Sequence, residues 1–154
     1  MPARHIVAIG GSDAGISAAL RICELDPSTE VTVVVADAYP NFSICGIPYY
    51  VSGEVTHWTN LAHRTADDLA ATGMRVLTDT RATRINVGEH TLDVLDPTGA
   101  PTELSYDALI VGTGAVSARP PITGLTGPDA LGPKDGVHLL HSMGDTFAVM
   151  ESLD

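Results

Sequence analysis

The order of apolar and polar positions divides the start of the chain into a strand, a helix and a second strand. An unbroken apolar run that ends in two glycines, residues 5–11, predicts a buried strand. Residues 15–25 carry apolar side chains at helical spacing, and residues 31–36 form a β-branched run typical of a strand. The helix face predicted to be buried carries Ile16, Ala19, Leu20 and Cys23. A strand, helix and strand so close together predict a right-handed βαβ unit and a parallel sheet.

The pattern in the middle of the chain is different. Residues 65–73 predict a short helix, capped by Thr65 and stopped by Gly73. Four later segments alternate as strands do: 74–79, 82–87, 91–96 and 101–106. Turn sequences, VGEH and DPTGA, separate the last three of them. We therefore expect an antiparallel β meander inserted into the α/β fold rather than a further βαβ unit.

The last part of the chain predicts two more strands and a helix. Residues 107–115 predict another buried strand that runs into glycine, and residues 137–140 are a candidate for a last short strand. Residues 142–153 predict a helix whose first turn is capped by the pair Ser142 and Asp145.

Length and composition favour one domain, residues 1–154, with a real core. The formal net charge of −11 disfavours nucleic acid as a partner, because binding to phosphate depends on cationic contacts. No apolar run approaches the roughly 20 residues of a membrane helix, and the N-terminus lacks an apolar signal core. We expect a soluble, cytoplasmic protein that does not bind a membrane. The two cysteines do not suggest a disulfide scaffold, and the six histidines show no metal-binding spacing.

The first strand–helix junction, IGGSDAGISAA, contains most of a G-x-G-x-x-G pattern. Gly10 and Gly15 occupy its first and third glycine positions, and Ser12 replaces the middle glycine. Such a turn brings a helix N-terminus close to the pyrophosphate of a dinucleotide. The candidate cofactor contacts are Gly10, Gly11, Ser12, Asp13, Ala14 and Gly15, with Asp37 as the ribose-binding acid after the second strand. The alternative is a structural turn that binds no ligand.

A cysteine lies in the stretch FSICGIPYY, within an irregular segment, residues 37–60. Cys45 precedes a short predicted helix, and helix N-termini favour the thiolate form of a cysteine. Cys45 is therefore a candidate redox centre, with a small buried hydrophobic residue as the alternative. For Cys23 the helical spacing favours a place in the core.

Three segments together carry a resemblance to a known family: IGGSDAG, NFSICGIPYYVSGEV and YDALIVGTGAVSARPPITGL. From Arg4 to Asp154 the chain resembles the N-terminal FAD-binding part of the single-cysteine pyridine nucleotide–disulfide oxidoreductases. That group includes CoA-disulfide reductases, NADH oxidases and NADH peroxidases. The resemblance implies a Rossmann-like FAD-binding domain of the α/β class, with electrons passing from NAD(P)H through FAD to Cys45. It also implies FAD contacts from Ala82, Thr113 and Gly114.

This chain departs from the family's usual residues in two places that concern the chemistry of the cysteine and its substrate. Oxidases and peroxidases of the family commonly carry a histidine where this chain has Asp13, and a carboxylate beside a sulfur disfavours the thiolate. A serine of the family's cysteine segment is replaced by Asn41, and the asparagine common before the cysteine is replaced by Ile44. The resemblance to CoA-disulfide reductases makes four residues candidate contacts for a small-molecule disulfide or thiol substrate: Ser17, Arg21, Asn41 and Ile44.

The resemblance also concerns the domains that family members carry in addition to the FAD-binding part. Family members continue with a second glycine-rich domain for NAD(P)H and a dimerisation domain, and they form homodimers. No second G-x-G-x-x-G occurs in this chain, so we expect NAD(P)H to act only through a domain absent from it. Three hypotheses remain: the FAD-binding part of a disulfide or thiol oxidoreductase, a catalytically silent FAD-binding module or truncated fragment, and an α/β domain without a flavin.

Overall fold

The computed structural model describes residues 3–153 and divides the chain into two compact units. The first unit comprises Met1–Phe42 and Ala62–Gly114, and the second comprises Ser43–Leu61 and Ala115–Asp154. Each unit is therefore built from two separate stretches of the chain. The antiparallel bridge between Phe42 and Ala62 joins the two stretches of the first unit where the insertion begins and ends.

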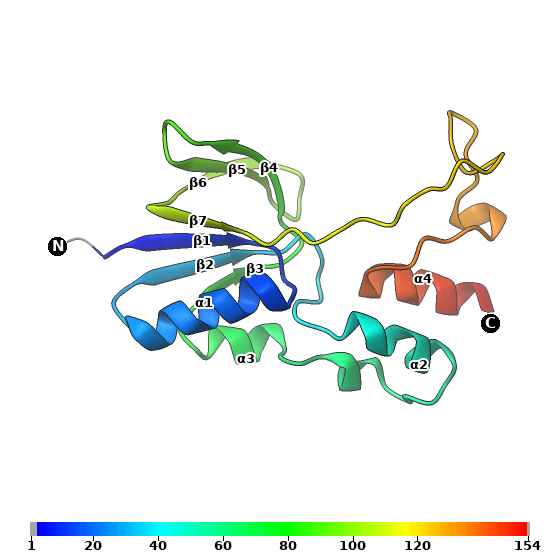
Figure 1. Cartoon of the computed structure of the whole chain (residues 1–154), viewed down its shortest axis with the longest axis horizontal. Helices are drawn as coiled ribbons and strands as arrows, with labels where there is room; N and C mark the ends of the chain where they lie inside the picture. The colour runs from blue at the N-terminus through cyan, green and yellow to red at the C-terminus, as the bar shows by residue number, and fades with distance from the viewer. Residues whose placement is uncertain (1–2, 154) are drawn as a thin grey trace. The chain divides into compact units, whose positions relative to one another are not determined.

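The first unit contains a four-stranded sheet in the order β3-β2-β1-β7, and every neighbouring pair is parallel (Figure 1). The strands are β1 (His5–Ile9), β2 (Glu30–Val34), β3 (Arg75–Leu77) and β7 (Ala108–Val111). Helix α1 (Asp13–Leu25) connects β1 to β2. The βαβ unit predicted from the start of the sequence is thereby confirmed.

Alternate residues of the central strands supply two separate cores, one on each face of the sheet. On one face, Ala8 of β1 and Val33 of β2 pack with the buried side of α1 and with Leu69. On the other face, Val7 and Val34 pack with buried residues of the meander. Successive side chains of a strand point to opposite faces, so a strand buried on both sides must be apolar throughout. This is why β1 appears in the sequence as an apolar run and β2 as a β-branched run, in which the hydroxyl of the buried Thr32 lies within hydrogen-bonding distance of His5.

The meander forms a second, antiparallel sheet in the order β4-β5-β6 (Figure 1). Its strands are β4 (Arg81–Asn86), β5 (Thr91–Leu95) and β6 (Pro101–Ser105). Leu92 and Val94 of β5 alternate with less buried neighbours and bury their side chains against the parallel sheet. The expected meander is confirmed for its last three segments, and with it the Rossmann-like fold class. The assignment of residues 74–79 to the meander was wrong, because β3 follows α3 and pairs in parallel with β2, which makes a further βαβ unit.

Helix α3 (Ala66–Ala70) covers the α1 side of the parallel sheet and begins with a complete capping box. The Thr65 hydroxyl accepts a hydrogen bond from the Asp68 amide at 3.1 Å, and the Asp68 carboxylate accepts one from the Thr65 amide at 2.8 Å. These hydrogen bonds lower the pKa of the exposed Asp68 carboxyl. The predicted cap is confirmed, and Gly73 follows the helix with a positive φ of 95°.

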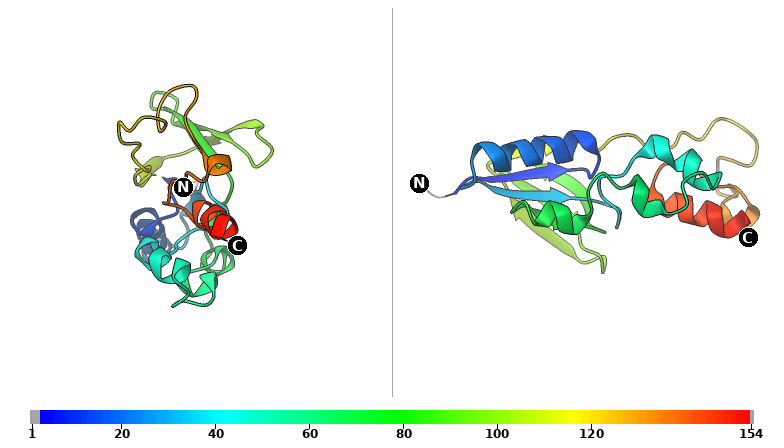
Figure 2. Two further views of the ribbon diagram at one scale, coloured as in Figure 1. Left: turned by 90° about the vertical axis from the view of Figure 1, so that its right-hand side faces the viewer. Right: turned by 90° about the horizontal axis from the view of Figure 1, so that it is seen from below.

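The second unit is built from short helices: η1 (Ile44–Gly46), α2 (Ile47–Val51), η2 (Trp58–Leu61), η3 (Pro133–Asp135) and α4 (Met143–Leu153). Figures 1 and 2 show α2 and α4 side by side, and residues of the two helices are in contact. The Trp58 and Phe147 rings meet edge to face, with centroids 5.7 Å apart. The predicted cap of α4 is present, since the Asp145 carboxylate accepts the Ser142 amide hydrogen bond at 2.9 Å.

Two expectations about the later strands were wrong. β7 is an edge strand of the described sheet rather than a buried one, and 60% of Val111 is exposed. Residues 137–140 form no strand, because no other segment of the described chain pairs with them. An apolar run shows that a strand can form, but its burial and its pairing depend on distant segments.

Candidate functional site

The turn between β1 and α1 requires glycine for two reasons. Gly10 has a φ of +112°, a conformation that side chains rarely adopt. A Cβ at Gly10 would also run into the backbone carbonyl of Gly112, and a Cβ at Gly15 would lie 2.6 Å from the Gly10 carbonyl oxygen. The Gly10 amide donates a hydrogen bond to the Val34 carbonyl at 2.9 Å, which ties the turn to β2.

Gly112, which follows β7, belongs to the same arrangement and was missed in the sequence. Its amide donates to the Ile9 carbonyl at 2.8 Å, and a Cβ added to it would lie 3.1 Å from the Gly15 amide nitrogen. Three glycines therefore let β1, β7 and the start of α1 approach one another at backbone distance. The signal that pointed to Gly112 was its position directly after an apolar strand, in VGTGA.

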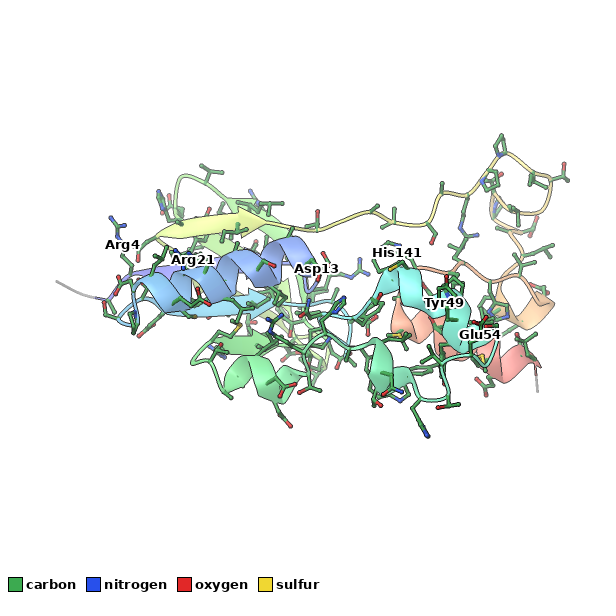
Figure 3. All side chains as sticks on the ribbon, turned by 60° about the horizontal axis from the view of Figure 1, so that its bottom comes forward. Arg4, Asp13, Arg21, Tyr49, Glu54 and His141 are labelled. Carbon is green, nitrogen blue, oxygen red and sulfur yellow. The ribbon has the colours of Figure 1, made fainter. Side chains whose placement is uncertain are left out.

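The turn leads into the N-terminus of α1, which is 13 residues long. Ser12 is the N-cap residue, with extended backbone angles, but its side chain makes no capping hydrogen bond. The first-turn amides of Asp13, Ala14 and Gly15 give this end of the helix a partial positive charge, which favours an anionic ligand. Asp13 itself lies here with an exposed side chain, as Figure 3 shows.

Asn41 connects the loop after β2 to this turn. Its side chain is 2% exposed, and its Nδ2 donates a hydrogen bond to Asp13 Oδ1 at 3.0 Å. Its backbone amide donates to the Gly11 carbonyl at 2.6 Å. The structure thus places Asn41, a predicted substrate contact, in the first unit beside the predicted cofactor contacts.

The other predicted cofactor contacts of the first unit lie after its strands or in the meander. Asp37 follows β2 and accepts a hydrogen bond from the Tyr39 amide at 3.1 Å through its carboxylate. Ala82 lies in β4, half-buried against the meander-side core. Thr113 and Gly114 follow β7 and are exposed. Because parallel strands end at the same edge of a sheet, Asp37 and the Thr113–Gly114 pair lie at the edge that carries the glycine turn.

The residues at this edge fit a dinucleotide such as FAD on two observations. The turn holds the helix N-terminus close to the strands with no side-chain cap from Ser12 in the way. In addition, Asn41 Oδ1 is buried and has no hydrogen-bond partner among the described residues. A buried acceptor of this kind is rare unless a ligand or a water satisfies it.

Cys45 lies in the second unit, on the short helix η1, and its side chain is exposed. Its Sγ is 3.2 Å from the Ser43 hydroxyl, within hydrogen-bonding distance. The Ser43 amide donates to the Leu61 carbonyl at 2.7 Å, so the turn that carries the thiol is anchored to the end of η2. The exposed side chain is inconsistent with the alternative that Cys45 is a buried core residue.

Cys23 has the opposite environment. It is partly buried against the α1-side core, and burial raises the pKa of its thiol. A thiol with a raised pKa is a weak nucleophile at neutral pH. The prediction that Cys23 belongs to the helix core is confirmed.

The three remaining predicted substrate contacts are surface residues. Ser17 and Arg21 lie on the exposed side of α1, where Arg21 pairs with Glu24 at 3.0 Å (Figure 3 labels Arg21). Both partners of this pair are more than 60% exposed, so solvent screens it and it contributes little to stability. Ile44 is 44% exposed and adjoins Cys45 in the second unit. No described contact brings Ser17 or Arg21 to Asn41.

The fold, the glycine turn and the cysteine segment agree with a match to a family model. Residues 4–150 match the model described as pyridine nucleotide-disulphide oxidoreductase. The chain belongs to this family. Membership supports a flavin and a nicotinamide as the cofactors and confirms the resemblance seen in the sequence.

Two curated proteins and a solved structure match most of the chain. An NADH oxidase of Enterococcus faecalis is 34% identical over 127 residues, 82% of this chain and 28% of that protein. A coenzyme A disulfide reductase of Staphylococcus haemolyticus is 29% identical, over 98% of this chain and 32% of that protein. The structure of an NAD-dependent persulfide reductase from A. fulgidus superimposes with a TM-score of 0.84 at 36% identity, over 97% of this chain and 27% of that one. The chain thus spans about a third of the length of these relatives.

Within residues 3–153, no helix is both long and apolar enough to cross a membrane. The same residues contain no cluster of three His, Cys, Asp or Glu side chains arranged to hold a metal ion.

Proposed function

We propose that residues 1–154 are the FAD-binding portion of an NAD(P)H-dependent disulfide or thiol oxidoreductase, with Cys45 as the redox-active residue next to the flavin. The observation that carries the proposal is the exposed thiol on a constrained turn in the most specific segment of the sequence, Asn41 to Tyr49. A structural cysteine of a core would be buried, as Cys23 partly is.

The local structure around Cys45 suits a nucleophile. The Ser43 hydroxyl lies 3.2 Å from the sulfur, close enough for a hydrogen bond that orients the thiol. Gly46 lets η1 pack tightly, since a Cβ there would lie 2.6 Å from the Leu61 side chain. The thiol is thus accessible while the backbone that carries it is anchored.

The proposed reaction begins at the Cys45 sulfur. Its thiolate attacks one sulfur of a small disulfide, the substrate S–S bond breaks, and one substrate thiol leaves. Cys45 is then joined to the other half of the substrate in a mixed disulfide. When bound, FAD supplies the two electrons, drawn from NAD(P)H, that reduce this bond and release the second thiol. Position 50, where a second cysteine would allow an internal disulfide, is Tyr50.

In the first unit, the glycine turn and the α1 N-terminus would hold the FAD pyrophosphate, and Asp37 would bind its ribose. Ala82, Thr113 and Gly114 would complete the contacts with the flavin nucleotide. We propose that the nicotinamide binds to a domain other than the one described here, and that the complete protein forms a homodimer. Two unpaired cysteines suit the reducing conditions of the cytoplasm.

The substrate class is a small-molecule disulfide or thiol, as the relatives' names suggest: one reduces coenzyme A disulfide and another a persulfide. The NADH oxidase among the relatives suggests oxygen as a further electron acceptor to be tested. The exposed Ile44 adjoins the sulfur and is our candidate for a residue that affects the choice among these substrates.

The test compares Cys45→Ser with the matched control Cys23→Ser in the complete protein, which includes the proposed nicotinamide-binding domain, loaded with FAD. NADH or NADPH is supplied with coenzyme A disulfide, glutathione disulfide or cystine, and nucleotide oxidation is followed by absorbance. We expect Cys45→Ser to bind FAD normally but to lose at least 100-fold in disulfide reduction, whereas Cys23→Ser retains it. Retention of activity by Cys45→Ser would contradict the proposed nucleophile.

The same experiment separates the other hypotheses. If the protein binds FAD but neither nucleotide bleaches the flavin absorbance, it is a silent FAD-binding module. If it binds no FAD, the glycine turn is only structural and the flavin proposal is wrong.

A further inference from the structure

A residue of the first turn of α1 and a residue of the loop after β2 are in contact with each other. Asn41 Nδ2 donates a hydrogen bond to Asp13 Oδ1 at 3.0 Å. The residues are 28 positions apart in the chain. The pair links the loop after β2 to the first turn of α1.

Asn41 is held in place by hydrogen bonds of both its side chain and its backbone. Its φ of +53° lies in the left-handed region, which asparagine tolerates better than most residues. Its backbone amide donates to the Gly11 carbonyl at 2.6 Å, and its carbonyl accepts from the His63 amide at 2.8 Å. With 2% of the residue exposed, the amide group has little freedom to turn elsewhere.

Asp13 poses a difficulty for an anionic ligand at the α1 N-terminus. A carboxylate in the first turn is attracted to the same amides that would bind a diphosphate, and it repels that diphosphate. The hydrogen bond from Asn41 holds the Asp13 carboxylate toward the β2 loop and offsets part of its charge. Ser12, the N-cap residue, adds no capping bond of its own.

A second observation independently indicates a ligand at this turn. Asn41 Oδ1 is buried without a partner among the described residues. It shares one carbon atom with the Nδ2 that binds Asp13, so it lies within the same small region. Leaving a buried amide oxygen unsatisfied costs free energy, and a hydroxyl group of FAD or a water, rather than the acceptor-only diphosphate, can donate the hydrogen bond that removes that cost.

We propose that Asn41 is a positioning residue of the cofactor site: by holding the Asp13 carboxylate aside, it keeps the first-turn amides of α1 open to the diphosphate of FAD. The proposal rests on the proposed function, since it assumes that FAD binds at this turn. Asn41 acts through Asp13, so its contribution to affinity depends on the charge of Asp13. The direct substrate contact that the sequence suggested for Asn41 remains a separate prediction.

The test is a double-mutant cycle with FAD dissociation constants measured by flavin fluorescence. Asn41→Gly removes the amide and retains a backbone that tolerates positive φ. We expect it to weaken FAD binding at least 10-fold when Asp13 is present and less than 3-fold in the Asp13→Asn background. We also expect the loss to shrink at high salt, because salt screens the repulsion between Asp13 and the diphosphate. A merely structural role would give the same loss in both backgrounds and at both salt concentrations.

Asn41→Asp is the second variant, used in case Asn41→Gly does not fold. It retains the side-chain shape but places a carboxylate against Asp13, so its loss of affinity should exceed that of Asn41→Gly. Thermal unfolding without FAD checks that each variant is folded at the temperature of the titration. If the wild type binds FAD and both Asn41 variants bind it equally well, this inference alone is overturned. If the wild type binds no FAD, the proposed function fails with it.

Discussion

Replacing Gly10 by alanine tests whether the glycine turn is as closely packed as the structure shows. The new methyl group would meet the Gly112 carbonyl, whose carbon lies 2.7 Å from the ideal Cβ position. The residue would also have to adopt a φ near +112°. The backbone conformation costs roughly 1–2 kcal/mol for a residue with a Cβ. Overpacking against a backbone that cannot rotate away adds about 1–3 kcal/mol.

The matched control is Gly73→Ala, which separates the two costs. Gly73 has a similar φ of +95°, but no atom lies within 4 Å of a Cβ built there. We therefore expect Gly73→Ala to lose roughly 1–2 kcal/mol of unfolding free energy and Gly10→Ala to lose roughly 2–5 kcal/mol. Urea unfolding followed by far-UV circular dichroism measures both values.

The comparison has a clear negative outcome. If Gly10→Ala destabilises the protein no more than Gly73→Ala does, then β1 and β7 do not approach as closely as the glycine contacts indicate. If Gly10→Ala also weakens FAD binding while Gly73→Ala does not, the result would support the proposal that the glycine turn contacts FAD.

Three further predictions concern other parts of the chain. Thr65→Ala should lower the free energy of unfolding by about 1 kcal/mol near pH 7 and by less near pH 2. The pKa of Asp68 is lowered by its hydrogen bonds to Thr65, so the stabilisation from this capping pair is lost as the pH falls through the pKa of the folded state. Equal losses at the two pH values, measured by urea unfolding, would refute this. With a chromogenic disulfide at neutral pH, the exposed Cys45 should react fast and Cys23, whose thiol pKa is raised by burial, slowly; the fast phase should vanish in Cys45→Ser, and its persistence would count against the assignment. Phe147→Leu should shift the emission of the single tryptophan and destabilise the second unit by about 0.5–1.5 kcal/mol in fluorescence-monitored unfolding, whereas an unchanged spectrum would exclude the edge-to-face contact.

Local patterns predicted the parts of the fold that depend on neighbouring residues. The βαβ unit followed from two apolar runs around a helical period, and the caps at Thr65 and Ser142 followed from side chains three residues apart. The meander followed from its turns. Each of these features is decided within a window of a few residues, so the sequence alone sufficed.

The features that failed or were missed depend on distant segments. Val111 resembles a core residue in sequence, but its exposure is decided by the position of β7 at the edge of the described sheet. The approach of Gly112 to Gly10 and the hydrogen bond from Asn41 to Asp13 join residues far apart in the chain. No periodicity within one segment contains this information.

The discontinuity of the second unit affects how the chain is made. Its two stretches, Ser43–Leu61 and Ala115–Asp154, are separated by most of the sheet-forming part of the first unit. A ribosome that adds 5–20 residues per second needs roughly 5–20 s to synthesise the residues between Cys45 and α4. During that interval the remaining strands of the first unit, β3 to β7, are synthesised, while η1 and α2 still lack the helix α4 that α2 contacts. The thiol at Cys45 therefore emerges on an incomplete unit, and because it is also exposed in the finished structure, α4 does not shield it from oxidation once synthesis ends.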